Sequence, residues 1–177
     1  KSLKAGIIGL LLVMIFMIAY YRLPGLLSVF SLAVYAALSL AVFKILGVTL
    51  TLSGIAGLIL SIGMAVDANV LVFERLKEEL RLGKSLKSAM EESFLRAWPS
   101  IRDSHITALI SCVFLVWFGT GFIKGFASVL AIGTLINLFT AITVTRAIMR
   151  FVFGLMSERG NILILGYTSQ EIKNDIK

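Results

Sequence analysis

The chain has 177 residues, of which 58% are hydrophobic and 15% are charged, and its formal net charge is +7. Soluble domains are typically about 45–50% apolar and about 25% charged, so this composition excludes a water-soluble globule and a disordered chain. A single cysteine, Cys112, excludes an intrachain disulfide. The mean hydropathy of +0.96 indicates an all-α membrane protein.

Uncharged runs of sufficient length predict a bundle of five transmembrane helices. A helix needs roughly 20 apolar residues to cross a hydrocarbon core of about 30 Å. Pro24 and Gly25 separate the first two runs, because proline lacks a backbone donor and disfavours helix at the residue before it. The runs make up a predicted membrane domain over 1–156, and their bounds are 5–21, 23–43, 52–73, 104–123 and 125–145.

The connection 74–103 is the one long loop, and it holds most of the charge. Apolar residues recur in it at helical spacing opposite a charged face, which is typical of an amphipathic helix. This helix either lies at the membrane surface or is a solvated connector that covers the bundle. Its apolar positions are Leu86, Met90, Phe94, Ala97 and Trp98.

The distribution of basic residues predicts the orientation of the chain. Alternating spans place the N-terminus and the turns at Lys44 and Lys124 on one side, with Arg22, the loop 74–103 and the tail 157–177 on the other. Most of the 17 Lys and Arg lie on the second side. The positive-inside rule makes that side, loop and tail included, cytoplasmic and the N-terminus extracytoplasmic. The net charge then reflects orientation rather than nucleic-acid binding.

The first residues indicate a fragment. The chain starts at Lys1 without methionine, and it has no signal peptide with a basic start and a small-residue cleavage site. We therefore expect it to be part of a longer protein. The tail carries no recognisable chemistry.

Asp67 is the most informative position because it is an acidic side chain inside an apolar span. A carboxylate at membrane depth costs roughly 2.5–3.5 kcal/mol on insertion scales, so it is a functional-site candidate. Counting back from Glu74 at about 1.5 Å per residue places it about 10 Å inside the cytoplasmic boundary. Two interpretations are open: proton or ion binding, or a buried interhelical hydrogen bond or ion pair.

The same span carries small residues at spacings of three and four, a pattern that lets a neighbouring helix approach closely. At about 100° per residue, Asp67 borders this strip rather than lying within it. Asn69 is about 200° from Asp67, and we expect it to hydrogen-bond between helices. The strip consists of Gly54, Gly57, Ser61, Ala65 and Ala68.

Asp103 directly precedes the fourth span, and Thr107 and Ser111 follow it at four-residue spacing. Asp103 either stabilises the start of the helix or lines the cytoplasmic mouth of an ion path with the two hydroxyls. The nearby His105 can titrate in the physiological range. No second histidine or cysteine accompanies it, so no metal site is expected.

Polar residues also follow one another along the last span. Asn137, Thr140 and Thr143 recur at three-residue spacing. Such groups usually hydrogen-bond across helices, and lining a hydrated path is the second interpretation.

Motifs for catalysis are missing from the sequence. It contains neither a G-x-S-x-G elbow nor a G-x-x-x-x-G-K-[ST] loop, and Asp67 is the one acidic residue clearly at membrane depth, whereas an intramembrane aspartyl protease needs two. We therefore expect no enzyme activity and no cofactor.

One segment closely resembles the signature of the SecD/SecF family of bacterial protein-translocase subunits, within the resistance-nodulation-division superfamily. The resemblance covers roughly 2–151, and Glu74-Arg75 is similar to the SecD branch, since SecF typically has Asp-Arg there. The residues that carry it are Gly63-Met64-Ala65-Val66-Asp67-Ala68-Asn69-Val70-Leu71, supported by Tyr20-Tyr21-Arg22-Leu23-Pro24-Gly25 and Phe118-Gly119-Thr120-Gly121.

The resemblance implies the second to sixth helices of a six-helix half, without the first helix and the large extracytoplasmic domain. It implies pairing with SecF in the bacterial inner membrane, work beside the SecYEG channel and its accessory subunits, and contact with preprotein through the missing domain. Asp67 matches an aspartate implicated in the family's proton path, and Asp103 matches an aspartate common at the start of this helix.

Three hypotheses follow. The chain couples an ion gradient to protein export through Asp67, it is a passive scaffold for SecF and the channel, or it is half of another exporter of the superfamily. One carboxylate among hydroxyls suits protons or sodium equally, so the coupling ion stays open.

Overall fold

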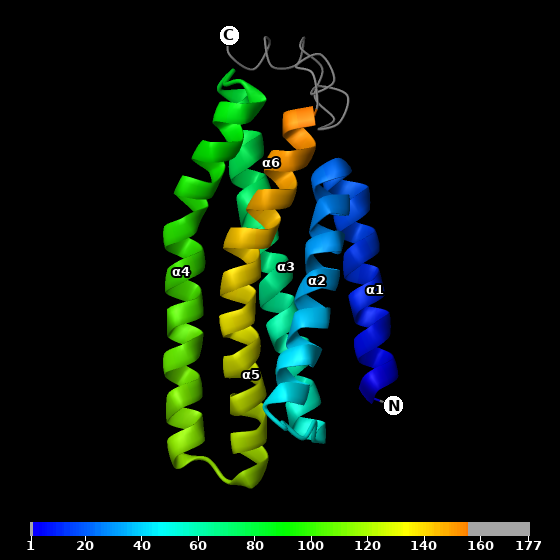
Figure 1. Ribbon diagram of the computed structural model, residues 1–177, viewed down its shortest axis with the longest axis vertical. Coiled ribbons are helices and arrows are strands. Elements are labelled where there is room, and N and C mark those ends of the chain that lie inside the picture. Colours follow the sequence, from blue (N-terminus) through cyan, green and yellow to red (C-terminus); the bar gives the residue numbers. More distant parts are fainter. Residues whose placement is uncertain (1, 156–177) are drawn as a thin grey trace.

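The computed structural model describes residues 2–155, and every regular element in this range is helical (Figure 1). Two helices near the middle of the chain are the longest, and a π-helical turn interrupts the last long helix. The elements are α1 (Ser2–Tyr21), α2 (Leu23–Ile45), α3 (Leu52–Arg81), α4 (Leu86–Phe118), α5 (Gly121–Phe139), η1 (Thr140–Val144) and α6 (Thr145–Leu155).

The helices meet the length and composition needed to cross a membrane. Four helices qualify: Leu23–Ile45, Leu52–Arg81, Leu86–Phe118 and the continuous rod Gly121–Gly154. The described apolar part of α1, Gly6–Tyr21, is shorter. Large apolar side chains such as Phe16 and Phe114 are exposed on the bundle, as a lipid-facing surface requires. The chain is therefore a multi-pass membrane protein, as the composition predicts.

The turn between α1 and α2 depends on residues that tolerate an unusual backbone. Arg22 has a positive φ of 52°, and Pro24 lies in the first turn of α2, where no intrahelical donor is needed. A Cβ on Gly25 would lie 2.1 Å from the carbonyl oxygen of Met17. Only glycine permits this approach, so α1 and α2 form a close antiparallel pair.

The predicted loop 74–103 is almost entirely helical. α3 continues to Arg81 and α4 begins at Leu86, where Ser85 accepts a hydrogen bond from the Ser88 backbone. Gly83 has a φ of +79° in the short turn between them. The predicted loop therefore consists of the last turns of α3, a short turn and the first turns of α4. We call this part of the bundle, residues 74–103, the charged end.

The apolar face predicted for this segment packs on the protein. Leu86, Met90, Phe94 and Ala97 are buried in one cluster with side chains of α3 and α6, including Phe73, Leu76, Met149 and Phe153. This packing accounts for the amphipathic pattern, so a location at the membrane surface does not follow from it.

Ion pairs join the helices at the charged end. Glu79 is buried and pairs with Lys84 at 2.6 Å and with Arg96. Glu91 of α4 accepts hydrogen bonds from Arg146 and Arg150 of α6. Glu91 lies outside the predicted membrane spans, and the two guanidinium groups hold the pKa of its carboxyl group below its usual range.

Several predicted span limits differ from the helices, and the largest differences are in the last two spans. α4 ends at Phe118 rather than at Ile123, because the chain becomes extended at Gly119 before α5 begins at Gly121. The last helix runs beyond Thr145 to Leu155, through η1. The tail 157–177 lies outside the described residues.

α3 is the central helix of the bundle. It packs along α5 and α4, whereas α1 packs chiefly on α2 at the edge opposite α4 (Figure 1). The predicted small-residue strip of α3, Gly54, Gly57, Ser61, Ala65 and Ala68, is buried. A Cβ on Gly57 would lie 2.6 Å from the Phe126 carbonyl oxygen, and one on Gly133 would lie 2.6 Å from Ser61 Oγ. Backbone contact of this kind fixes the rotation of α3 about its axis.

Gly57→Ala is expected to lower the stability of the bundle by about 1–3 kcal/mol, because the added methyl group forces α3 and α5 apart. Thermal unfolding of the full-length protein in detergent measures this loss. Gly63→Ala on the same helix is the matched control, since nothing lies within 4 Å of a Cβ added at Gly63. Equal unfolding midpoints for the two variants would contradict the close contact.

Candidate functional site

Asp67 lies at a polar pocket between α3 and α4. The pocket has a volume of about 260 Å³, and the Asp67 side chain is exposed at it. Two serines and a histidine of α4 supply the other polar groups of the lining, so the carboxylate faces hydroxyls and an imidazole rather than hydrocarbon alone. The lining residues are Met64, Asp67, Ala68, Leu71, Ser100, Ile101, Ser104 and His105.

His105 is buried, and both of its ring nitrogens have partners. Nδ1 lies 2.7 Å from the carbonyl oxygen of Ile101, and Nε2 lies 2.8 Å from Nδ2 of Asn137 on α5. Because a carbonyl oxygen can only accept, Nδ1 donates, and the lone pair of Nε2 accepts from the Asn137 amide. This arrangement corresponds to the neutral imidazole with its proton on Nδ1.

Asn137 connects this site to the irregular part of the last helix. Its side chain is buried, and its backbone carbonyl oxygen accepts a 3.1 Å hydrogen bond from Thr140 Oγ1. Thr140 starts the π-helical turn η1, in which the Thr145 backbone N–H donates to the Thr140 carbonyl oxygen. Turns of this type are rare and occur frequently at functional sites.

Asn69 belongs to a different polar cluster. Its Nδ2 donates to Ser28 Oγ at 3.0 Å, and its Oδ1 accepts from Thr145 Oγ1 at 3.1 Å. All three side chains are buried, and they come from α3, α2 and α6. Asn69 therefore joins three helices and does not line the pocket of Asp67.

Asp103 and Thr107 lie on another face of α4. Both are exposed, and Asp103 pairs with Arg102 at 2.9 Å. Thr107 Oγ1 donates to the Asp103 carbonyl oxygen, and Ser111 Oγ donates to the Thr107 carbonyl oxygen. The structure does not bring these side chains into the Asp67 pocket, and their role in an ion path stays a prediction.

The serines of this site and the role of His105 could not be identified from the sequence pattern. Ser100 and Ser104 are four residues apart, as are Ile101 and His105, so all four share the face of α4 that meets Asp67. The same spacing carried Asp103 and Thr107 onto a neighbouring face. Sequence spacing alone does not tell which face of α4 meets α3.

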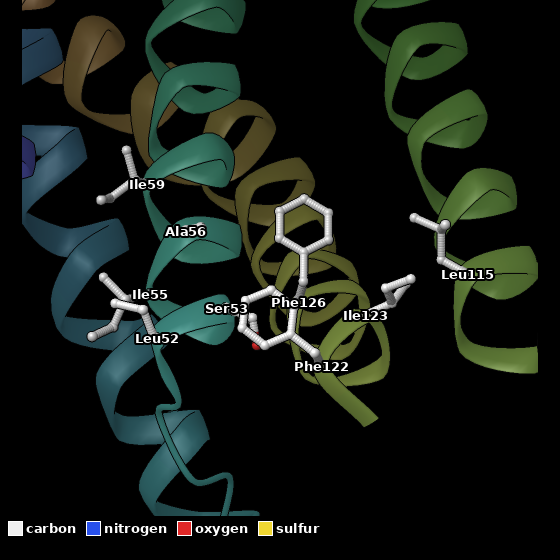
Figure 2. A pocket seen from close by; sticks show the side chains of 9 residues that line it. All are labelled: Leu52, Ser53, Ile55, Ala56, Ile59, Leu115, Phe122, Ile123 and Phe126. Atoms are coloured by element: carbon white, nitrogen blue, oxygen red, sulfur yellow. The ribbon is translucent and has the colours of Figure 1, made fainter. Parts of the chain in front are cut away.

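A second pocket lies at the opposite end of the bundle and has a different character. Figure 2 shows it between the start of α3, the end of α4 and the start of α5, with Phe122 and Phe126 projecting into it. Its volume is about 430 Å³, and Ser53 is the one polar side chain in the lining. Unlike the Asp67 pocket, it offers no charged or titratable group.

The membrane-crossing helices pack through small residues, and a carboxylate and a buried histidine–asparagine pair lie between them. These features define a helical membrane protein with an ionisable site. Residues 1–154 match the family described as "Protein export membrane protein SecD/SecF, C-terminal". The chain belongs to this SecD/SecF family. The description is of an export protein, not of an enzyme family.

Relatives are similar over most of the chain. The protein translocase subunit SecD of Thermobaculum terrenum is 54% identical over 97% of this chain and 34% of that protein. The subunit SecD of a Synechocystis species is 58% identical over 84% of this chain and 32% of that protein. The chain thus spans about a third of the length of these curated relatives.

A solved structure has the same arrangement of helices. The crystal structure of SecDF from Thermus thermophilus, described as a translocon-associated membrane protein, is 40% identical with a TM-score of 0.83. The similarity covers 86% of this chain and 21% of that one. This agreement supports the all-helical membrane bundle.

Asn69→Leu is expected to destabilise the bundle by about 1 kcal/mol, because interhelical hydrogen bonds of this kind contribute about 0.6 kcal/mol each on average and Ser28 and Thr145 lose their partner. The unfolding midpoint of the full-length protein checks it. The exposed Thr143→Val is the control, expected within about 0.5 kcal/mol of wild type. An unchanged midpoint for Asn69→Leu would refute its role in joining the helices.

Proposed function

We propose that this chain is the membrane part of a SecD subunit and that it couples an ion gradient to protein export through Asp67. The observation that carries the proposal is the position of this carboxylate, within a membrane-crossing helix, at a pocket that two serines and a histidine also line. Ionisable groups at membrane depth are costly, and they usually mark ion or proton pathways. The relatives named as SecD translocase subunits supply the kind of work to which the ion is coupled.

The proposed partners are SecF, as the second half of the membrane domain, and the SecYEG channel with its accessory subunits. A SecDF protein of Bacillus subtilis is 46% identical over 82% of this chain, and its name combines the two halves. We propose that contacts with the preprotein are made by the parts of the SecD relatives that lie outside the third matched by this chain. The exposed apolar faces of α1 and α4 offer surfaces for other helices and for lipid.

The proposed location is the bacterial inner membrane, with the charged end in the cytoplasm. Arg75, Arg81, Lys84, Lys87 and Arg102 all lie at that end, in keeping with the positive-inside rule. In this orientation Asp67 lies on the cytoplasmic half of α3. Asp103, exposed on a neighbouring face of α4, is our proposed entry to the path.

Asp67→Asn in the full-length subunit, reconstituted with SecF and the channel in vesicles, is expected to abolish gradient-driven ion flux and gradient-dependent export. The amide keeps the size of the side chain but cannot exchange a proton or neutralise a cation. Flux and export are measured together under a proton gradient and then under a sodium gradient, which identifies the ion.

Asp67→Glu is the matched control because it retains the ionisable group, and it is expected to keep part of both activities. Equal assembly of the variants is checked first. If Asp67→Asn assembles and both activities persist, the coupling proposal is wrong. If assembly and activity are lost together in both variants, the chain acts as a scaffold.

A further inference from the structure

His105 is the one histidine in the chain, and it lies inside the bundle at the same pocket as Asp67. A buried imidazole needs partners for both nitrogens, and those partners decide which protonation states it can adopt. Here the partner of Nδ1 can only accept a hydrogen bond, whereas the partner of Nε2 can either donate or accept one.

The partner of Nδ1 is the carbonyl oxygen of Ile101, at 2.7 Å. Because this oxygen can only accept, it keeps a proton on Nδ1 in every protonation state of the ring. A proton that binds to His105 therefore has to bind at Nε2.

The partner of Nε2 is the Asn137 amide, at 2.8 Å. In the neutral state Nδ2 of the amide donates to the lone pair of Nε2. An asparagine amide also has an acceptor oxygen, and a half turn about its terminal bond exchanges the two atoms. Asn137 can thus satisfy His105 in both states with no movement of α4 or α5.

Burial disfavours the charged form of His105, and the charge of Asp67 offsets part of this cost. From α3, the Asp67 carboxylate faces the same pocket, while α5 presents the neutral Asn137. On α4 itself, Asp103 and Arg102 pair with each other on the exposed face. From α6, Arg146 lines a neighbouring pocket with Ile101 and is paired with Glu91. Asp67 is therefore the one acidic group of the pocket, and it compensates an imidazolium.

A proton exchange between the two groups leaves the charge of the pocket unchanged. The O–H bond of the Asp67 carboxylic acid breaks and an N–H bond forms at Nε2, so two neutral groups become a carboxylate and an imidazolium. A compensated pair is far less costly in a low-dielectric interior than a single charge. The pocket of about 260 Å³ has room for water, which occupies about 30 Å³ per molecule in the liquid, to carry the proton.

We propose that His105 is a second proton-binding group of the Asp67 site, protonated at Nε2, and that Asn137 turns its side-chain amide to accept the new N–H through Oδ1. This inference rests on the proposed coupling function and adds a residue to its path. It also commits the site to protons, since an imidazolium has no lone pair for sodium.

The first test is the nitrogen-15 NMR spectrum of the full-length subunit with SecF in membranes, labelled at histidine. Subtracting the spectrum of His105→Asn isolates the His105 signal. We expect it to change from neutral imidazole to imidazolium between about pH 5 and 8. A signal that stays neutral over this range would overturn the proposal, whatever the outcome for Asp67.

The second test is the pH profile of proton flux in vesicles. His105→Asn is expected to reduce the flux and to remove one inflection from the profile, and His105→Gln, which keeps an amide near Nε2, is expected to do the same. Wild-type profiles in both assembled variants would contradict the inference.

Substitutions of Asn137 give a signed control. Asn137→Asp places a carboxylate at Nε2 and is expected to move the His105 titration midpoint upward by about 1 to 3 pH units. Asn137→Leu removes the acceptor and is expected to move it downward. A merely structural histidine would show no titration to move. Failure of the coupling function is a separate outcome, namely persistent flux in Asp67→Asn.

Discussion

The close backbone contact between α3 and α5 is the constraint on which the site depends. Gly57 lets the Phe126 carbonyl oxygen approach the α3 backbone, and Gly133 does the same for Ser61. With α3 held in this rotation, Asp67 faces α4 while Asn69 faces α2 and α6. The packing of this strip thus directs Asn69 towards neighbouring helices and leaves the Asp67 carboxylate exposed at a pocket.

Buried donors and acceptors in a membrane bundle need partners. Asn69, Asn137 and His105 meet this need with hydrogen bonds to neighbouring helices. Asp67 differs because its side chain is exposed at a pocket. A fully paired carboxylate would stabilise the bundle, whereas one open to a pocket can exchange its ion.

Much of this was predictable because apolar length and small-residue spacing are local properties. The helical spans and the angle between Asp67 and Asn69 follow from periodicity. The continuation of α3 and α4 through 74–103 could not be predicted in this way. It depends on ion pairs of the buried Glu79 with Lys84 and of Glu91 with Arg146, which make a charge-rich segment part of the folded bundle. The pocket shared by Asp67 and His105 was not predictable either, because the face of α4 that turns inward depends on packing against two other helices.

The proposed function requires Asp67 to change its protonation as the protein works. Infrared difference spectroscopy of the full-length complex in membranes, recorded as a proton gradient is imposed, observes this directly. A carboxylic acid C=O band that responds to the gradient and disappears in Asp67→Asn is the predicted result. The absence of any band specific to Asp67 in an active complex would contradict the claim.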